Sequence, residues 1–285
     1  MEVSDLKNVR DVGVILPSIY NEFFAEVLEG IENSLQHESY FLMLNCARND
    51  SDREKECVRS LVSRKVSGII ILSPNTKNFD EKFYEDVAKI VPLVFVNASV
   101  KIPGASYVEN DEEAGAQDAI RYLFNLGHKK ILMVSGINSD SYTLKENCFK
   151  EMMSNEGIDA ESYIVHVEEG NSSETADLVT DILLETIPKT DATAIFCFND
   201  LMAAGALNAC KYLDLKVPDD ISIIGYDNTA ISNIFMPKLT SVDQNMFQLG
   251  RTSAQLLIEK IEKGETKRMT FYNTIVERES TGPAK

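Results

Sequence analysis

The sequence has little positive charge. Its 285 residues include 28 Lys and Arg against 45 Asp and Glu, so the formal net charge is −17 with histidine neutral. No stretch gathers five or more basic residues, and an acidic surface repels a polyanion. Nucleic-acid binding by these residues is therefore excluded. The 44% of apolar residues is ordinary for a globular protein.

Closely spaced glycines are also missing. The 14 glycines never lie closer than nine positions apart, the separation of Gly127 and Gly136. A phosphate-binding loop needs neighbouring glycines so that backbone N–H groups can approach the anion. This spacing excludes the dinucleotide-binding fingerprint, the Walker loop and the G-x-S-x-G turn of hydrolases.

Groups that carry catalysis or bind metals are scarce. His37, His128 and His166 are isolated and lack the i, i+4 spacing of a helical metal site. No serine or cysteine has an evident base as its partner, and no pair of carboxylates stands out. We expect surface or hinge histidines, no catalytic residue, no metal and no cofactor. An enzyme that uses an acidic cleft is the weaker alternative.

Long apolar runs and paired cysteines are absent as well. The five cysteines, at positions 46, 57, 148, 197 and 210, are odd in number and form no C-x-x-C motif. This pattern predicts buried thiols in a reducing compartment. No apolar run approaches the roughly 18 residues of a membrane span, and the first residues lack the apolar core of a secretory signal. We therefore expect a cytoplasmic protein with no membrane partner.

Short β-rich apolar runs alternate with segments of helical periodicity, which predicts α/β structure with parallel sheets and crossover helices. The first series has strands at 12–16, 40–45, 68–72, 93–97 and 106–109, with helices after Asn21 and at 52–65, 80–90 and 114–126. The second has strands at 131–135, 162–167, 194–198 and 222–226, with helices at 144–155, 173–185 and 201–213. A helix at 247–263 and a strand at 269–276 complete the chain. Two similar series predict two lobes joined by short crossings.

Polar and aromatic residues follow several predicted strands at their carboxyl ends, where ligands bind in open parallel sheets. They are Ser18, Tyr20, Phe23, Phe24, Asn110, Asp111, Asn138, Ser139, Asp140, Tyr142, Asn199, Asp200, Asp227 and Asn228. Carboxylates and amides can bond ligand hydroxyls, and an aromatic face can cover a sugar or a base. The alternative is that such residues cap the next helix, with Asp200 as the cap before Leu201. Core packing is the alternative for at least one of Phe23 and Phe24.

Ordered motifs along the chain carry a family resemblance. They are VGVILP at 12–17, NEFFAEVLEGI at 21–31, VSGIII at 66–71, LGHKKI at 126–131, FNDLMAAGA at 198–206, ISIIGYD at 221–227, LTSV at 239–242 and REST at 278–281. In this order and at these intervals the sequence resembles the effector-binding domain of the LacI/GalR family of transcriptional regulators. The resemblance covers essentially residues 8 to 281.

The resemblance implies a periplasmic-binding-protein type I architecture: two Rossmann-like lobes with parallel sheets, three crossover segments, and a ligand held between the lobes. The implied boundaries are 11–127 plus 241–268 for the N-terminal lobe and 128–240 plus 269–283 for the C-terminal lobe. Residues 1–10 resemble a remnant of the linker after the family's helix-turn-helix headpiece. That headpiece, which we expect to be missing from this chain, would bind operator DNA as part of a homodimer.

The resemblance also implies ligand positions. Asp227 and Asn199 match ligand-contacting residues, and Asp111 matches a carboxylate on the opposite lobe. Lys145 stands where the family has the arginine of an R-x-x-G-F motif, and lysine lacks the planar fork that holds two ligand oxygens. A solvated lysine is the alternative there, and Cys148 replaces the glycine of that motif. The candidate ligand-binding residues are Asp227, Asn199, Asp111, Lys145, Tyr20, Phe23, Ser139, Tyr142 and Met246, the last by apolar contact only.

The expected function is therefore that of a ligand sensor. A small polar effector, a sugar or sugar derivative, would bind between the lobes and change the affinity of a repressor for operator DNA. The alternative is a solute-binding protein of a sugar transporter, which has the same two lobes and cleft.

Overall fold

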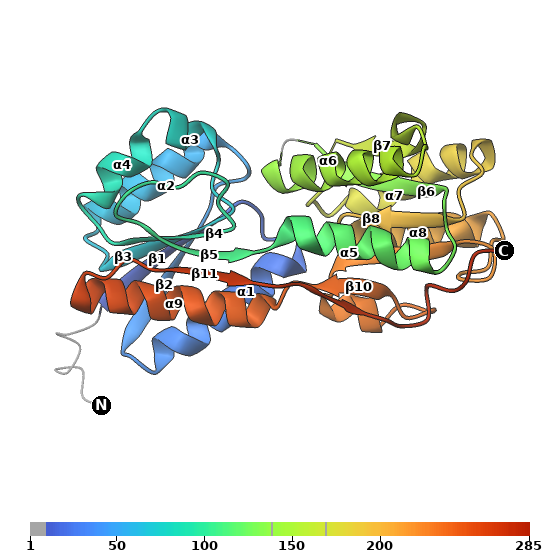
Figure 1. Cartoon of the computed structure of the whole chain (residues 1–285). Helices are drawn as coiled ribbons and strands as arrows, with labels where there is room; N and C mark the ends of the chain where they lie inside the picture. The colour runs from blue at the N-terminus through green and yellow to red at the C-terminus, as the bar shows by residue number, and fades with distance from the viewer. Residues whose placement is uncertain (1–9, 138, 169) are drawn as a thin grey trace. The chain divides into compact units, whose positions relative to one another are not determined.

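The computed structural model describes residues 10–137, 139–168 and 170–285. The linker predicted at residues 1–10 lies outside these residues except for Arg10, which begins a strand, and Asn138 lies outside them too. The described chain divides into two compact units. The first extends to Asn110 and adds Asn245–Phe271, and the second comprises Asp111–Gln244 and Tyr272–Lys285. The chain passes from one unit to the other three times, as the family resemblance implied (Figure 1).

The first unit contains a parallel sheet in the order β11-β5-β4-β3-β1-β2. Its strands are β1 (Arg10–Leu16), β2 (Tyr40–Cys46), β3 (Gly68–Leu72), β4 (Leu93–Val96), β5 (Ser106–Asn110) and β11 (Arg268–Phe271). Its helices are α1 (Glu22–Gln36), α2 (Ser51–Ser63), α3 (Lys77–Asp80), α4 (Phe83–Ala88) and α9 (Met246–Lys263). Asn21 caps α1, because its side chain accepts a hydrogen bond of 2.9 Å from Phe23 N.

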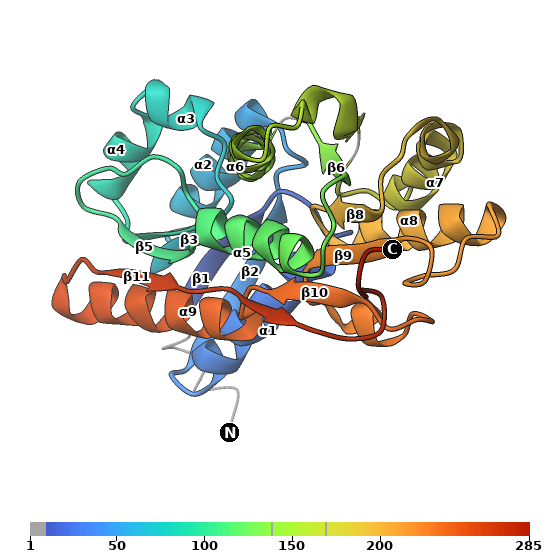
Figure 2. The ribbon, with the colours of Figure 1, turned by 45° about the vertical axis from the view of Figure 1, so that its right-hand side comes forward.

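The inner strands of this sheet are buried on both faces. Successive residues of a strand point to opposite sides, so each strand contributes to two cores. Val12 and Val14 of β1 pack with α1 and α9, whereas Ile15 packs with α2 on the other face. Helix α9 runs beside α1 (Figures 1 and 2). They touch where Gly250 faces Val27, because a Cβ on Gly250 would lie 1.9 Å from Val27 O. Only glycine permits this approach of the two backbones.

The second unit contains the sheet β12-β10-β9-β8-β6-β7, parallel except that β12 runs antiparallel to β10. Its strands are β6 (Ile131–Gly136), β7 (Ile164–Val167), β8 (Ala194–Cys197), β9 (Ser222–Asp227), β10 (Thr240–Asp243) and β12 (Thr274–Val276). Its helices are α5 (Glu112–Asn125), α6 (Asp140–Asn155), α7 (Thr175–Thr186) and α8 (Asp200–Tyr212), with the short 3-10 helices η2 (Ala160–Tyr163), η3 (Ile187–Lys189) and η4 (Ala230–Asn233).

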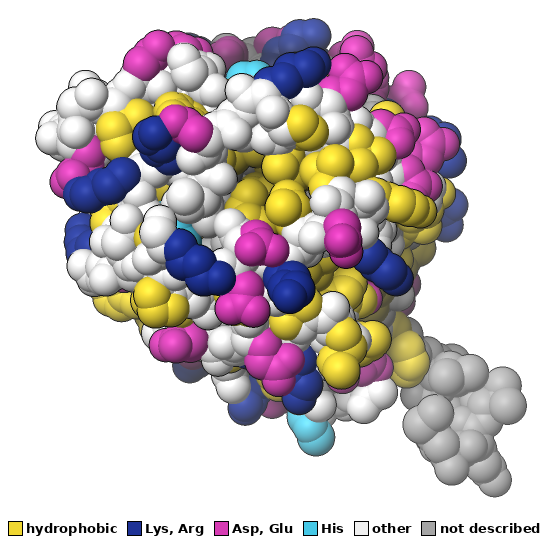
Figure 3. All heavy atoms as spheres, turned by 90° about the vertical axis from the view of Figure 1, so that its right-hand side faces the viewer, with side chains coloured by type: hydrophobic (Ala, Val, Ile, Leu, Met, Phe, Trp, Pro, Cys, Tyr) yellow, Lys and Arg dark blue, Asp and Glu magenta, His cyan; other side chains and the backbone are white. Residues whose placement is uncertain are grey.

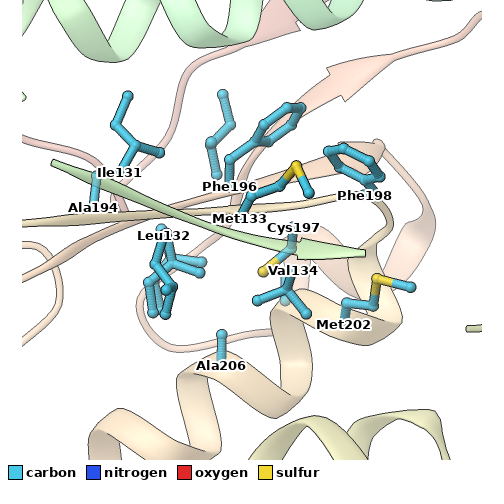
Figure 4. Packing of buried hydrophobic residues seen from close by; sticks show 14 of the residues in the cluster. Ile131, Leu132, Met133, Val134, Ala194, Phe196, Cys197, Phe198, Met202 and Ala206 are labelled. Atoms are coloured by element: carbon cyan, nitrogen blue, oxygen red, sulfur yellow. The ribbon is translucent and has the colours of Figure 1, made fainter. Parts of the chain in front are cut away.

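The core of the second unit is continuous through this sheet. Figure 4 shows Ile131, Met133, Phe196 and Phe198 on one side of β6 and β8, and Leu132 and Val134 on the other side, facing Met202 and Ala206 of α8. Strands buried on both faces explain the unbroken apolar runs in the sequence.

The C-terminal residues are fastened to the second sheet by buried polar groups. Ser280 Oγ donates to Ile223 O at 2.6 Å and accepts from Thr240 N at 2.8 Å. The ring nitrogens of His128 lie 2.9 Å from Thr193 Oγ1 and 2.9 Å from Gly282 O. His128 is only 2% exposed and lies within the second unit, away from the crossings, so the prediction of a surface or hinge histidine is wrong at this position. His128, Ile223, Thr240 and Ser280, which belong to four of the family motifs, therefore help to hold the fold together.

Three lobe assignments differ from the predicted ones, and one of them concerns residues 269–271, which were expected in the C-terminal lobe but belong to the first unit. Helix α5 groups with the second unit, because Ala116, Ile120 and Leu123 belong to that unit's core. Strand β10 also belongs there, since it pairs with β9 and β12.

Three predicted elements are divided. The helix expected at 80–90 shares its first residue with the end of α3 and is otherwise α4, because Lys82 between them has a left-handed φ of 57°. The strand expected at 162–167 begins as η2 and continues as β7. The strand expected at 269–276 is β11 in the first sheet and β12 in the second, so the last crossing interrupts it.

Candidate functional site

Four of the predicted site residues meet at the carboxyl ends of β6, β8 and β9 in the second unit. Tyr142 and Lys145 lie three residues apart on α6 and therefore face the same side of that helix. The rings of Tyr142 and Phe198 have centroids 6.3 Å apart, and Asn199 follows Phe198. Asp227 ends β9 directly after Tyr226. The cluster thus combines one cation, one carboxylate, one amide and three aromatic rings.

Lys145 is buried without an internal anion. The residue is 2% exposed, and its ammonium lies 3.9 Å from the ring centroid of Tyr226 and 5.8 Å from that of Phe198. Among the described residues it has neither a hydrogen-bond acceptor nor a carboxylate in ion-pair contact. Ring faces attract a cation, and the attraction strengthens away from water. The alternative of a solvated helix lysine is therefore wrong.

Two glycines make room for the Tyr142 ring. A Cβ on Gly136 would lie 2.4 Å from a ring carbon of Tyr142, and one on Gly170 would lie 2.7 Å from its hydroxyl oxygen. That hydroxyl donates to Gly170 O at 3.4 Å and accepts from Asn199 Nδ2 at 3.3 Å. Burial, and then the nearby charge of Asp227, raise the pKa of Tyr142, so its hydroxyl stays protonated.

Asn199 acts as a helix cap. Its Oδ1 accepts a hydrogen bond of 2.8 Å from Met202 N, and its Nδ2 donates to Gly170 O at 2.7 Å. The cap of α8 is therefore Asn199, and the prediction of Asp200 for that place is wrong. Because its amide hydrogens bond protein groups, Asn199 supports Tyr142 and Gly170 at the site.

Asp200 has a role that the sequence did not reveal. This carboxylate is 1% exposed and accepts hydrogen bonds from Ser241 Oγ at 2.7 Å, Thr229 N at 2.7 Å and Thr229 Oγ1 at 2.8 Å. Burial raises its pKa to about 6, although these donors oppose that shift. Asp200 thereby ties the turn after β9 to β10 and α8.

Asp227 sits at the start of that turn in a strained conformation. Its φ is 107°, and the following Asn228 has φ 58°, a region that non-glycine residues rarely adopt. Asp227 Oδ1 accepts from Gln244 Nε2 at 2.6 Å, and Arg278 Nη2 donates to Asn228 Oδ1 at 2.5 Å. The side chain of Asp227 is 4% exposed. The surrounding bonds hold a buried carboxylate at the end of β9.

Asp111 and Ser139 stand at helix starts in the second unit. Asp111 caps α5, since its Oδ1 accepts from Ala114 N at 3.0 Å. It belongs to the same unit as Asp227, so its predicted place on the opposite lobe is wrong. Ser139 precedes α6 and makes no side-chain cap bond, although its carbonyl accepts from Thr143 N at 3.0 Å.

The candidates of the first unit differ in exposure. Tyr20, which follows β1, is 58% exposed. Phe23 is 6% exposed and packs edge-to-face on Phe24 with ring centroids 5.2 Å apart, and Met246 is 2% exposed in the same core. These positions agree with the alternative of core packing for Phe23, while Tyr20 remains available to a ligand.

Neither metal chemistry nor a membrane span is indicated in the part of the chain that the structure describes. No group of three or more His, Cys, Asp or Glu is arranged to hold a metal ion there. None of the helices described is both long and apolar enough to cross a membrane. On the face shown in Figure 3, Lys and Arg side chains are interspersed with Asp and Glu side chains rather than gathered.

Known proteins resemble this chain along most of its length. The family profile of the periplasmic binding protein-like domain matches residues 120–281. The HTH-type transcriptional repressor PurR of Aliivibrio salmonicida is 30% identical over 278 residues, which is 95% of this chain and 81% of that protein. Catabolite control protein A of Priestia megaterium is 32% identical over 262 residues, 90% of this chain and 76% of that protein.

A solved structure extends the comparison to the fold. The LacI family transcriptional regulator from Enterococcus faecalis V583, with bound ribose, has a TM-score of 0.81 and 30% identity, and the match covers 97% of this chain and 100% of that one. The Aliivibrio salmonicida and Enterococcus faecalis relatives are named as regulators of transcription, which disfavours the transporter alternative. The ordered motifs, the two α/β units and these similarities together show that the chain belongs to the LacI/GalR family of transcriptional regulators.

Proposed function

We propose that this protein senses a small polar effector, a sugar or sugar derivative, and that binding changes the affinity of the regulator for operator DNA. The observation that carries the proposal is the pair of buried, oppositely charged side chains at the strand ends. Lys145 and Asp227 are 2% and 4% exposed. The Lys145 ammonium lies over the rings of Tyr226 and Phe198, and the charge of Asp227 is near enough to Tyr142 and Tyr226 to help raise the pKa of both hydroxyls. Donor, acceptor and ring face are the groups that a polyhydroxylated ligand requires.

The bound ribose of the Enterococcus faecalis regulator supports a sugar-like effector. Catalysis is not part of the proposal, because the cluster pairs no nucleophile with a base. A repressor acts where the genome is, so we place the protein in the cytoplasm. We assign contact with operator DNA to a headpiece outside these 285 residues. The net charge of the 285 residues is −17, which disfavours binding to DNA.

A homodimer is the assembly that we propose. Strand β2 is an edge strand of the first sheet, and its residues Phe41 and Leu44 are 53% and 44% exposed. In the second unit, Ile234 and Met236 are 73% and 87% exposed. Apolar side chains on a sheet edge favour pairing with another chain. A second copy of this chain presents the same surfaces, so we infer that it covers them.

The test is a thermal-shift panel of pentoses, hexoses, disaccharides and their derivatives, followed by titration calorimetry of the hits. Ligand at 100 times Kd stabilises the fold by about 2.7 kcal/mol. We expect Asp227→Ala to lose at least tenfold in affinity. The control is Asp177→Ala, which changes an exposed carboxylate on α7 and should bind as the wild type does. Equal affinity of Asp227→Ala and wild type would refute the site.

A further inference from the structure

The ammonium of Lys145 lacks a polar partner. Ion pairs satisfy two other charged side chains of α6, Glu146 and Lys150. Lys150 illustrates this, since its Nζ lies 2.9 Å from Glu146 Oε1 and 2.8 Å from Glu161 Oε1. Lys145 is more deeply buried than Lys150, yet its ammonium lies over ring faces and, among the described residues, makes no hydrogen bond or ion pair.

A charge in this position destabilises the empty protein. Burial removes the water that an ammonium binds strongly, and a ring face returns only part of that hydration free energy. Folding tolerates such a group where a ligand supplies the missing partner. Lys145 lies three residues beyond Tyr142 and above the Tyr226 ring, so its ammonium is part of the proposed effector site. The missing partner would therefore be a group of the effector.

The requirement is best met by an anionic oxygen. An ammonium has three donors and a full positive charge, whereas a sugar hydroxyl offers a weak dipole. A phosphate or carboxylate neutralises the charge and accepts several hydrogen bonds. Lysine acts on such groups as a point charge and does not need the planar geometry of a guanidinium.

We propose that the effector carries an acidic group, a phosphate or a carboxylate, which binds Lys145, while its hydroxyls meet Asp227. The inference rests on the proposed function and specifies the class of ligand: a phosphorylated sugar or a sugar acid rather than a neutral sugar. Asp227 suits the hydroxyl end because a carboxylate accepts hydrogen bonds and repels an anion. The two charged residues therefore orient the effector.

The first experiment compares the empty proteins. Lys145→Met keeps the length and the apolar stem of the side chain and removes the charge. We expect its Tm to equal or exceed that of the wild type, because the buried ammonium is gone. Lys150→Met, the matched control on the same helix, should show no gain. A Tm of Lys145→Met below that of both other proteins would mean that the ammonium stabilises the empty site, and would overturn the proposal.

The second experiment measures binding by calorimetry at fixed ionic strength. The probes are ribose, ribose 5-phosphate and ribonate, glucose, glucose 6-phosphate and gluconate, and inorganic phosphate. We expect a phosphorylated or carboxylated sugar to bind wild type at least tenfold more tightly than its neutral parent. That preference should vanish in Lys145→Met and persist in Lys150→Met. Comparison of the phosphate with the carboxylate of the same sugar identifies the acidic group.

The outcomes separate this inference from the proposed function. A neutral sugar that binds as tightly as both of its acidic forms overturns the acidic ligand and leaves the sugar sensor intact. The same holds if the preference persists in Lys145→Met. Inorganic phosphate that binds as tightly as the sugar phosphates indicates an adventitious ion only, and also overturns the inference. If no sugar of either kind binds, both proposals are contradicted.

Discussion

The buried carboxylate of Asp200 gives the protein a pH-dependent stability that one substitution should remove. Its pKa is raised to about 6 in the folded protein, against 3.8 for an exposed aspartate, because burial disfavours the charged form. The folded state therefore holds the proton more tightly than the unfolded state. Stability from this group is greatest below pH 3.8 and decreases as the pH rises towards 6.

The size of the effect follows from the two pKa values. A pKa shift of one unit corresponds to about 1.4 kcal/mol of unfolding free energy. The rise of the Asp200 pKa from 3.8 to about 6 therefore corresponds to about 3 kcal/mol when the pH covers the whole range between the two values. Between pH 5.0 and pH 7.5, which avoids the isoelectric region near 4.6, the same linkage relation leaves about 1 kcal/mol. The wild type should lose that amount from Asp200 alone as the pH rises.

Urea unfolding of the wild type and Asp200→Asn at several pH values measures this contribution. Burial also raises the pKa of Glu54, but both proteins share this group, so their difference isolates Asp200. The difference in unfolding free energy between the two proteins should change by about 1 kcal/mol from pH 5.0 to pH 7.5, and the wild type should be the relatively less stable protein at high pH. Asp177→Asn, an exposed control, should follow the wild type. Parallel pH profiles of the wild type and Asp200→Asn would refute the reasoning.

Three further predictions concern packing, the site and assembly. Gly250→Ala should lower the unfolding free energy by about 3 kcal/mol or more in urea titrations, because the new methyl group would meet Val27 O at 1.9 Å; an unchanged midpoint would contradict the close helix crossing. Tyr142→Phe should lower stability by about 1 kcal/mol, because it removes the hydroxyl that bonds Gly170 O and Asn199 Nδ2; no loss in the same assay would show that this hydroxyl is not held. Phe41→Glu combined with Leu44→Glu should shift sedimentation towards the monomer, while Glu56→Gln, an exposed change on α2, should not. A dimer of undiminished affinity in the double variant would exclude β2 from the interface.

The sequence predicted the sheets well because strands buried on both faces read as unbroken apolar runs. Val12–Leu16, Gly68–Leu72 and Ala194–Cys197 are such runs, and each is a strand. It could not assign α5 to a unit, since an amphipathic helix shows which of its faces is apolar but not which core receives that face. The sequence also did not predict that the last strand is divided. The residues of β11 and β12 are alike in type, although the two strands join different sheets.

The sequence predicted part of the arrangement of the candidate site. Its place at the strand ends follows from the general geometry of parallel sheets, and Tyr142, Lys145, Asn199 and Asp227 do lie together there. The sequence could not distinguish a cap from a ligand group, because Asn199 and Asp200 suit both roles. Nor could it reveal the burial of Lys145, since lysine is usually exposed. Only the tertiary contacts with Tyr226 and Phe198 show that this charge is enclosed.

The central claim is that the effector binds the cluster of Lys145, Tyr142 and Asp227 in the second unit. The most direct measurement is a crystal structure of the protein with the compound that gives the largest thermal shift. We predict ligand oxygens within hydrogen-bond distance of Lys145 Nζ and Asp227, with a ring of the cluster against the apolar side of the ligand. A specifically bound ligand that contacts neither Lys145 nor Asp227 would contradict the claim.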